Sequence, residues 1–483
     1  MKKMKKLLAL VLTFAITLSL FAGCGSSSKE TTETKTDNKD NAAATEAPKS
    51  SEPAASGEKT VVTVWTKDRH DADFMQGLVD EYNATNTDNI EIKYEIYSDN
   101  YIQAVDMAFQ SGEAPDMMVV QETVINNYMN SGKFADLTPF MDDEFKKTFA
   151  DNMIDGFNVI DGKCYYVPTA STSCRLFYNK EIFARVGVDK APASMEEMIE
   201  IAKKITAELS GEGIYGFASN FKSPGSALGR SMTLAEMRES GNVNGFDFAK
   251  GEYDFSVYAD QIAAWKVLMS EECAFPGCES LDIDPLRTQF AAGKIGMYMS
   301  YTHAEPGVYK NQFPMEQEWG CAQIPTTGGV VNGAQNYQAI NGYFFNAESK
   351  NLDAAWKVYT AVFANVQNLA DYYSAGLGIS SVKAAIELAT PDEVYTKNPD
   401  LLVTATDKIY PKIPSAIKAD AVVIEGQDFF SVFAEMILGD LDIPTGLADL
   451  TERYNAAYRA GIKDGIGTEI KIAGFNPMNP MGN

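Results

Sequence analysis

The sequence predicts an α/β fold in which parallel strands alternate with helices. Between residues 61 and 121, β-branched runs of strand character alternate with two stretches whose apolar residues recur at helical spacing. The order strand, helix, strand, helix, strand is typical of a mainly parallel sheet covered by helices. From residue 60 the chain runs for about 424 residues, a length that favours two domains or lobes.

The elements of this first region are predicted one by one from their residue patterns. Strands are expected at 61–66 (VVTVWT), 90–97 (IEIKYEIY) and 116–121 (DMMVVQ), and helices at 71–86 and 100–112. Ligands bind at the carboxyl ends of the strands in such a sheet. The residues after the first and third strands, 65–69 and 121–123, therefore form one candidate site.

The first residues have the layout of a secretory signal peptide, predicted over 1–23. MKKMKK supplies four lysines, and the apolar run 7–22 is shorter than the roughly twenty residues that span a bilayer as a helix. Phe21-Ala22-Gly23-Cys24 resembles the lipobox of bacterial lipoproteins, which implies a lipid on Cys24. The alternative is an ordinary signal peptide followed by an incidental cysteine.

Residues 24–59 are predicted to form a flexible tether. From 25 to 59 there is no aromatic residue and no Val, Leu or Ile, so nothing can be buried to offset the entropy of ordering this segment. An anchored Cys24 and a polar leash would hold a folded domain near the extracellular face of the cell membrane.

Charge and composition limit the possible partners. The formal net charge of −25 makes nucleic acid a poor partner, because phosphate binding needs a basic face. With two histidines and no repeated cysteine spacing, neither a metal nor another cofactor is expected. Cys273 and Cys278 could close a small disulfide loop or remain buried thiols.

Six sequence blocks, in order and close to the expected spacing, resemble family 1 extracellular solute-binding proteins. They cover residues 111–120, 132–143, 161–189, 289–304, 319–329 and 341–359. The resemblance implies a two-lobed periplasmic-binding-protein-like fold (type 2), a monomer whose lobes close like a hinge around a solute. It also implies a partnership with the permease of an ABC importer. The implied lobes are 60–169 plus 342–392 and 170–341 plus 393–483.

Candidate solute contacts come from residue chemistry and from the resemblance. Sugars require aromatic faces for the ring and planar polar groups for the hydroxyls. Trp65, the tryptophan that ends the first strand, either lines the site or is core, whereas Trp265 and Trp356 are expected in the core. The candidates are Trp65, Lys67, Asp68, Gln121, Glu122, Thr172, Phe221, Tyr301, His303, Asn341 and Tyr343.

One block departs from the family pattern. In MYMSYTHA, Tyr301 stands where the family often has glycine, and His303 lies near the position of a ligand-stacking tryptophan. The departure argues against a typical stacked oligosaccharide, and the scarcity of tryptophan at the candidate site favours a solute smaller or less ring-like than a long dextrin.

The predicted function is a receptor for a mono- or oligosaccharide, and the family resemblance favours a neutral one. An acidic sugar would need Lys67, Arg69 or Arg175, and a polyamine would need Asp68, Glu122 and Tyr301. A tethered sensor or adhesin of the same fold is an alternative. An enzyme is not expected, because GxSxG, HExxH and Walker motifs are absent from the sequence and carboxylate pairs such as Asp116 with Glu122 arise by chance.

Overall fold

The computed structural model describes residues 59–97, 100–119, 128–129, 131–340 and 342–482, all within one compact unit, Ser56–Asn483. The predicted signal peptide, Cys24 and all but the last residue of the predicted tether lie outside this part. Among the described residues, no helix is both long and apolar enough to cross a membrane. The same residues contain no group of His, Cys, Asp and Glu side chains that could hold a metal ion.

The first sheet has four strands in the order β15-β3-β1-β2. Strand β1 is parallel to both of its neighbours, β2 and β3, and the edge strand β15 is antiparallel to β3. The strands are β1 (Thr60–Thr66), β2 (Ile90–Ile96), β3 (Met117–Val119) and β15 (Tyr343–Phe345). The three predicted strands are therefore confirmed, and a fourth is supplied by residues more than 200 positions later.

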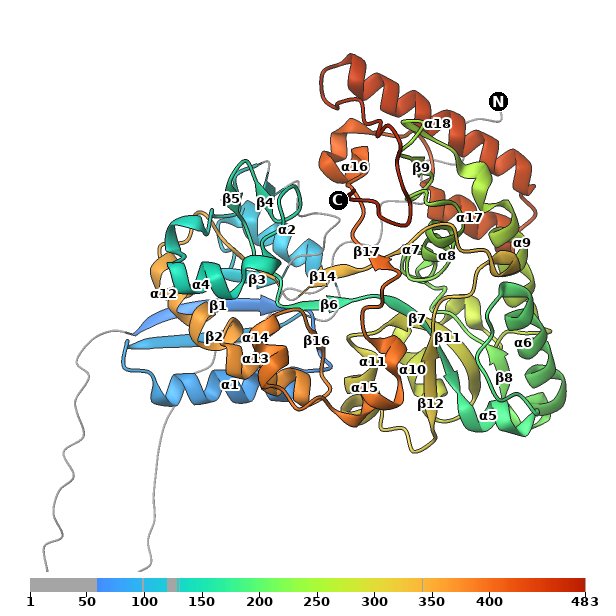
Figure 1. The fold of residues 1–483 in the computed structure, drawn as a ribbon, viewed down its shortest axis with the longest axis horizontal. Coiled ribbons are helices and arrows are strands. Elements are labelled where there is room, and N and C mark those ends of the chain that lie inside the picture. Colours follow the sequence, from blue (N-terminus) through green and yellow to red (C-terminus); the bar gives the residue numbers. More distant parts are fainter. Residues whose placement is uncertain (1–58, 98–99, 120–127, 130, 341, 483) are drawn as a thin grey trace, which may run out of the picture. The chain divides into compact units, whose positions relative to one another are not determined.

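The second sheet, in the order β12-β7-β11-β8, corrects one part of the prediction. Only β8 and β11 are parallel, while β7 is antiparallel to both of its neighbours. The sheet is mixed rather than mainly parallel, because the chain enters β7 at the edge where β11 ends, with Cys174 paired to Tyr301, and then runs the opposite way (Figure 1). The strands are β7 (Cys174–Asn179), β8 (Tyr215–Phe217), β11 (Ile295–Tyr301) and β12 (Trp319–Ala322).

Three short antiparallel strands form a further sheet, here called the connecting sheet. They are β6 (Ala170–Thr172), β14 (Gln338–Ile340) and β16 (Ile379–Ser380), with β6 in the centre. The chain passes from β6 through Ser173 into β7 (Figure 1). Beside them, β13 (Gln335–Asn336) pairs in parallel with β17 (Asp407–Lys408).

Helices follow most of the strands and cover the sheets. Those up to residue 209 are α1 (Ala72–Thr85), α2 (Tyr101–Ser111), α4 (Asp143–Thr148), α5 (Lys180–Arg185) and α6 (Met195–Leu209). The next are α7 (Pro224–Gly229), α8 (Met232–Ser240), α9 (Ala259–Leu268), α10 (Ile283–Ala291), α11 (Glu305–Gly307) and α12 (Leu352–Val358). The last are α13 (Val366–Ser374), α14 (Lys383–Leu388), α15 (Glu393–Lys397), α16 (Pro414–Ile417), α17 (Phe429–Leu438) and α18 (Ile443–Lys463).

Local sequence signals account for several boundaries. Gly112 ends α2 in the left-handed conformation, at φ 74°. Ser194 accepts a hydrogen bond from the backbone N–H of Glu197 at the start of α6, as the capping-box pattern predicts. The turn at Asp161 and Gly162, both with positive φ, joins the hairpin strands β4 (Val159–Ile160) and β5 (Lys163–Cys164). A second hairpin pairs β9 (Phe246–Asp247) with β10 (Glu252–Tyr253).

Two main hydrophobic cores follow the two sheets. One gathers buried side chains from residues 62–167 and again from 343–385. The other gathers them from 174–334 and from 410–458. Each core is therefore built from two separate stretches of chain, as a discontinuous lobe requires, although the lobe limits expected from the sequence stay predictions.

The tryptophans and cysteines differ in how they are packed. Trp265 is buried, and Trp356 is half-buried against Phe145 and Tyr359. Cys273 and Cys278 are free buried thiols, so the open question of a disulfide is answered in favour of thiols. Burial raises the pKa of both, which lowers their reactivity.

Candidate functional site

A buried ion pair lies where the connecting sheet passes into the second sheet. Nη2 of Arg175 is 2.6 Å from Oδ2 of Asp407, and both side chains are 0% exposed. Because a buried charge is stable only when it is paired and hydrogen-bonded, the surrounding donors and acceptors decide whether this pair is supported.

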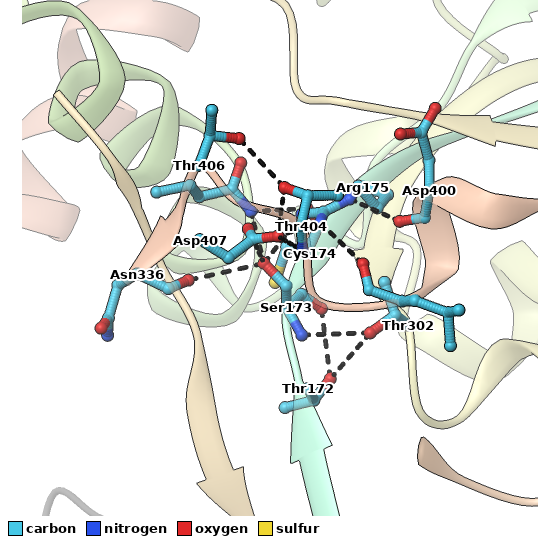
Figure 2. Close-up of polar contacts among 12 residues, drawn as sticks. Thr172, Ser173, Cys174, Arg175, Thr302, Asn336, Asp400, Thr404, Thr406 and Asp407 are labelled. Atoms are coloured by element: carbon cyan, nitrogen blue, oxygen red, sulfur yellow. Dashed lines mark hydrogen bonds and ion pairs between the residues drawn. The ribbon is translucent and has the colours of Figure 1, made fainter. Parts of the chain in front are cut away.

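Neighbouring groups satisfy this pair, as Figure 2 shows. Ser173 Oγ lies 3.1 Å from Oδ1 of Asp407 and accepts from Arg175 Nη1 at 2.8 Å. Gln335 Nε2 also donates to Ser173 Oγ, at 2.6 Å. The backbone N–H and the hydroxyl of Thr404 donate to Oδ2 of Asp407, at 2.6 and 2.7 Å. These five residues, here called the connecting network, tie β7, β13 and β17 together, with the residues just before β7 and β17.

A second polar group begins one residue earlier, at Thr172. Its hydroxyl oxygen lies 3.1 Å from the carbonyl oxygen of Ser173 and 2.8 Å from Nδ1 of His303. The hydroxyl and the imidazole ring are therefore joined by a hydrogen bond. His303 is in this way oriented by the end of β6.

The only two histidines of the sequence meet here. The rings of His70 and His303 lie edge to face, with centroids 5.6 Å apart. His70 follows β1, and its Nε2 is 3.0 Å from the carbonyl oxygen of Leu377, to which it must donate. The carboxyl end of β1 and the residues after β11 are thus in contact, although they are more than 200 positions apart.

The electrostatic environment of His303 is positive. Burial lowers the pKa of its imidazole well below the ordinary value, and the neighbouring His70, Lys67, Arg287 and Arg230 lower it further. The neutral ring is favoured, which suits a hydrogen bond with a hydroxyl group.

Tyr301, two residues before His303, is covered by a cation. The guanidinium carbon of Arg230 is 4.8 Å from the centroid of its ring, a cation–π distance. The rings of Tyr301 and His303 are 5.7 Å apart. We call His70, Thr172, Arg230, Tyr301 and His303 the histidine cluster.

Two ion pairs border the histidine cluster. Arg69, in the loop after β1, is 2.9 Å from Asp284 of α10. Arg287, also on α10, is 2.8 Å from the buried Glu305. Asp284 also contacts Arg287, at 3.2 Å. Both carboxylates are therefore neutralised by arginines.

The structure brings several of the predicted site residues together. Thr172, Tyr301 and His303 lie in one cluster, and the half-buried Lys67 and Asp68 precede His70 in its loop. Trp65 is half-buried at the end of β1, with its ring centroid 4.3 Å from that of Tyr97.

Other predicted residues lie elsewhere. Phe221 is 2% exposed and packs near Trp265 in the core of the second sheet. Tyr343 is buried in the core of the first sheet against Phe363, at 4.4 Å between centroids. Both burials favour structural roles, because an aromatic side chain inside a core has no free face. Gln121, Glu122 and Asn341 lie outside the described residues.

The arginines considered for an acidic sugar, and the acid Asp116 considered for an enzyme, are mostly engaged. Arg175 is the buried partner of Asp407, and Arg69 is paired with Asp284. Asp116 accepts from the backbone and hydroxyl of Thr63 on one oxygen and from Ser349 on the other. Asp116 is therefore a structural link between β1 and the residues before α12.

Sequence reasoning missed Arg230, Arg287 and Glu305. Arg230 lies between two short helices, α7 and α8, in a segment without a recognisable motif. Glu305 is close to His303 in sequence, but nothing in the sequence shows that Arg287 pairs with it.

A family comparison identifies the fold. Residues 67–368, well over half of the chain, match the model of the bacterial extracellular solute-binding proteins. The chain belongs to this family. The family recognition and the two-lobed α/β fold class predicted from the sequence are confirmed.

Curated relatives of this solute-binding protein match only in part. A binding protein from Brucella abortus is 24% identical over 279 residues, which make up 57% of this chain. The chain spans 64% of the length of that relative. The diacetylchitobiose binding protein of Streptomyces coelicolor is 28% identical over 159 residues, 32% of this chain and 36% of that one.

Solved structures share the fold over most of the chain. A chitin oligosaccharide binding protein has a TM-score of 0.67 at 17% identity, over 83% of this chain and 100% of that one. An ABC transporter solute-binding protein from Thermotoga lettingae, bound with α-D-tagatose, has a TM-score of 0.66 at 15% identity, over 83% and 100%. A maltose/maltodextrin-binding domain from Bdellovibrio bacteriovorus, bound to maltotriose, has 0.64 at 16%, over 84% and 100%.

Proposed function

We propose that this protein captures a small solute, a mono- or oligosaccharide, between its two lobes and delivers it to the permease of an ABC importer. The observation that carries the proposal is the contact between the loop after β1 and the residues after β11, made through His70 and His303. This contact lies beside the connecting sheet, where closure of two lobes would bring both segments onto a solute.

The chemistry of the histidine cluster and of the residues at the end of β1 supports a sugar. Tyr301 and Trp65 offer aromatic surface, while the imidazole of His303 and the polar groups of Lys67 and Asp68 can bind hydroxyl groups. The names of several relatives and structural neighbours also refer to sugars.

The proposal includes attachment to the outer face of the cell membrane through a lipid on Cys24. The signal peptide, the cysteine after small residues and the polar tether support this arrangement. We further propose that the protein acts as a monomer, because each chain carries both lobes.

A polyamine is less well supported than a sugar. Its ammonium groups would have to approach Tyr301, where the guanidinium of Arg230, 4.8 Å from the ring centroid, would repel them. The sensor or adhesin alternative uses the same site and differs only in whether the bound solute is transported.

Thermal denaturation of the compact unit Ser56–Asn483 with a panel of sugars, sugar acids and polyamines tests the proposal. A solute at a hundredfold excess over its dissociation constant should stabilise the protein by about 2.7 kcal/mol. A shift with polyamines alone, or with no sugar, would contradict sugar binding. Uptake of the identified sugar by cells that lack this chain separates the importer from the sensor, since unchanged uptake would contradict delivery.

A further inference from the structure

Arg230 is a buried cation without a buried counter-charge. Its residue is 8% exposed, yet it makes no ion pair with any carboxylate among the residues that the structure describes. Two other buried arginines, Arg175 and Arg287, are each paired with a buried carboxylate. Since burying an unpaired charge costs free energy, Arg230 would gain from a nearby anion, and none of the described residues pairs with it as one.

The contacts of Arg230 leave part of its hydrogen-bonding capacity unused. Nε donates to the carbonyl of Ser226 at 3.0 Å, Nη2 to the hydroxyl of Ser226 at 2.6 Å and Nη1 to the hydroxyl of Ser300 at 3.4 Å. These bonds use three of the five N–H donors of a guanidinium. They also fix the plane of the group over the ring of Tyr301, which pre-organises it for a planar acceptor.

Among the described residues around the histidine cluster, positive charge exceeds negative charge, and Arg230 is the cation that remains without a carboxylate. The carboxylates of Glu305 and Asp284 are paired with arginines. Asp71 accepts from the hydroxyl of Tyr372, and burial raises its pKa, which favours its neutral form. Lys67 and Asp68 are adjacent in the sequence and offset each other in net charge.

We propose that the solute is an acidic sugar and that Arg230 binds its carboxylate while Tyr301 and His303 contact the sugar ring. The inference rests on the proposed function, because it assigns the charge of the solute at the same site. It differs from the neutral sugar that the family resemblance favours. Among the arginines that the structure describes, Arg230 is the one that would favour an acidic sugar over the corresponding neutral sugar.

A carboxylate fits better than a phosphate. A guanidinium with two spare donors matches the two oxygens of one carboxylate in plane. A phosphate dianion presents three oxygens and about twice the charge, and the other arginines that border the cluster, Arg69 and Arg287, are already paired.

Calorimetric titration of the mature chain with matched sugars tests the assignment. The pairs are D-galacturonate with D-galactose, D-glucuronate with D-glucose, and the corresponding disaccharides, with glucose 6-phosphate as the phosphate arm. The acidic member of at least one pair should bind at least tenfold more tightly at low salt, and the preference should fall as salt is added. Arg230→Gln should remove most of the preference, and Arg230→Lys should keep part of it.

Arg238 provides a matched control. It is also buried and unpaired with a carboxylate in the described part of the chain, but it donates to the backbone carbonyl of Ile324, and the cation over Tyr301 is Arg230. Arg238→Gln should leave the preference for the acidic sugar unchanged. If Arg230→Gln does not fold, Arg230→Lys and the salt dependence of the unmodified protein still decide the question.

The outcomes separate the two proposals. Equal or tighter binding of the neutral members overturns the acidic solute and leaves sugar binding intact. Tighter binding of the sugar phosphate overturns the carboxylate. A preference that survives Arg230→Gln overturns the role of Arg230. Absence of binding by every sugar, with the protein folded, overturns both the acidic solute and the proposed function.

Discussion

The connecting network and the histidine cluster are neighbours, but they handle charge in opposite ways. In the network, Arg175 and Asp407 are fully buried, and serine, glutamine and threonine groups surround them. In the cluster, the cation of Arg230 lies over Tyr301 and has no carboxylate partner among the described residues. A buried charge whose partners all belong to the protein stabilises the fold, whereas a buried charge without a counter-charge can gain one from a ligand.

The largest expected effect is at the complete network. Asp407→Asn should lower the free energy of unfolding by about 3–5 kcal/mol, because it leaves Arg175 buried without its counter-charge. Urea denaturation of the chain without ligand measures the loss. Asp449→Asn is the control, since its pair with Arg453 is exposed and should be worth under about 1 kcal/mol. Similar losses for both variants would show that burial does not set these two ion pairs apart.

A buried acid without a cation provides the second test. Glu236 of α8 is 1% exposed, and one of its oxygens has no hydrogen-bond partner among the described residues. Burial, together with the charges of Glu239, Asp260 and Asp254, raises its pKa to about 9. Between pH 4.5 and 9 the unfolded chain ionises this group while the native state keeps it protonated, so stability falls as pH rises.

Glu236→Gln should therefore stabilise the protein by about 2 kcal/mol at pH 8. The gain should vanish near pH 4.5, where the carboxyl is protonated in both states. Denaturant midpoints of both proteins across this range measure the difference. A gain that does not depend on pH would show that packing, not ionisation, is responsible.

The histidine cluster should respond to acid. The pKa of His303 is lowered by burial and by positive neighbours, so below pH 6.5 the unfolded chain takes up a proton that the native ring resists. Stability conferred by the neutral ring is present above pH 6.5 and is lost as pH falls. His303→Gln should flatten this part of the pH profile of the unliganded protein, and an unchanged slope would contradict a lowered pKa.

The smallest effect is expected at the border of the cluster. Arg69→Gln removes a partly exposed ion pair with Asp284, which keeps its contact with Arg287. The expected loss is under about 1 kcal/mol, decreasing as salt is added. A loss as large as that of Asp407→Asn would show that the ion pair of Arg69 stabilises the protein as much as the buried pair of Arg175 and Asp407 does.

Sequence patterns predicted the fold better than the site. Strand and helix periodicity located β1 to β3 and their helices, because each signal lies within a few adjacent residues. The prediction of a mainly parallel second sheet was wrong, because the direction of β7 depends on the edge at which the chain enters the sheet after Ser173. No local sequence pattern records that edge. Phe221 and Tyr343 were expected at the solute but lie in cores, because position in a family block does not specify which way a ring faces.

The grouping of Thr172, Tyr301 and His303 could be predicted because they lie in two blocks of the family pattern. The contact of Arg230 with Tyr301 could not, because it joins residues 71 positions apart, and no local spacing records it. The same is true of Arg175 and Asp407, which are 232 positions apart.

The hydroxyl oxygen of Thr172 links the two polar groups. It is hydrogen-bonded to the ring of His303 and lies 3.1 Å from the carbonyl oxygen of Ser173, whose side chain contacts Asp407. One hydroxyl group thus connects the ring to the strand that joins the two sheets. Since energetic coupling between two sites is reciprocal, a ligand that moves the ring of His303 should also shift this strand, and a shift of the strand should change the hydrogen bonding of His303.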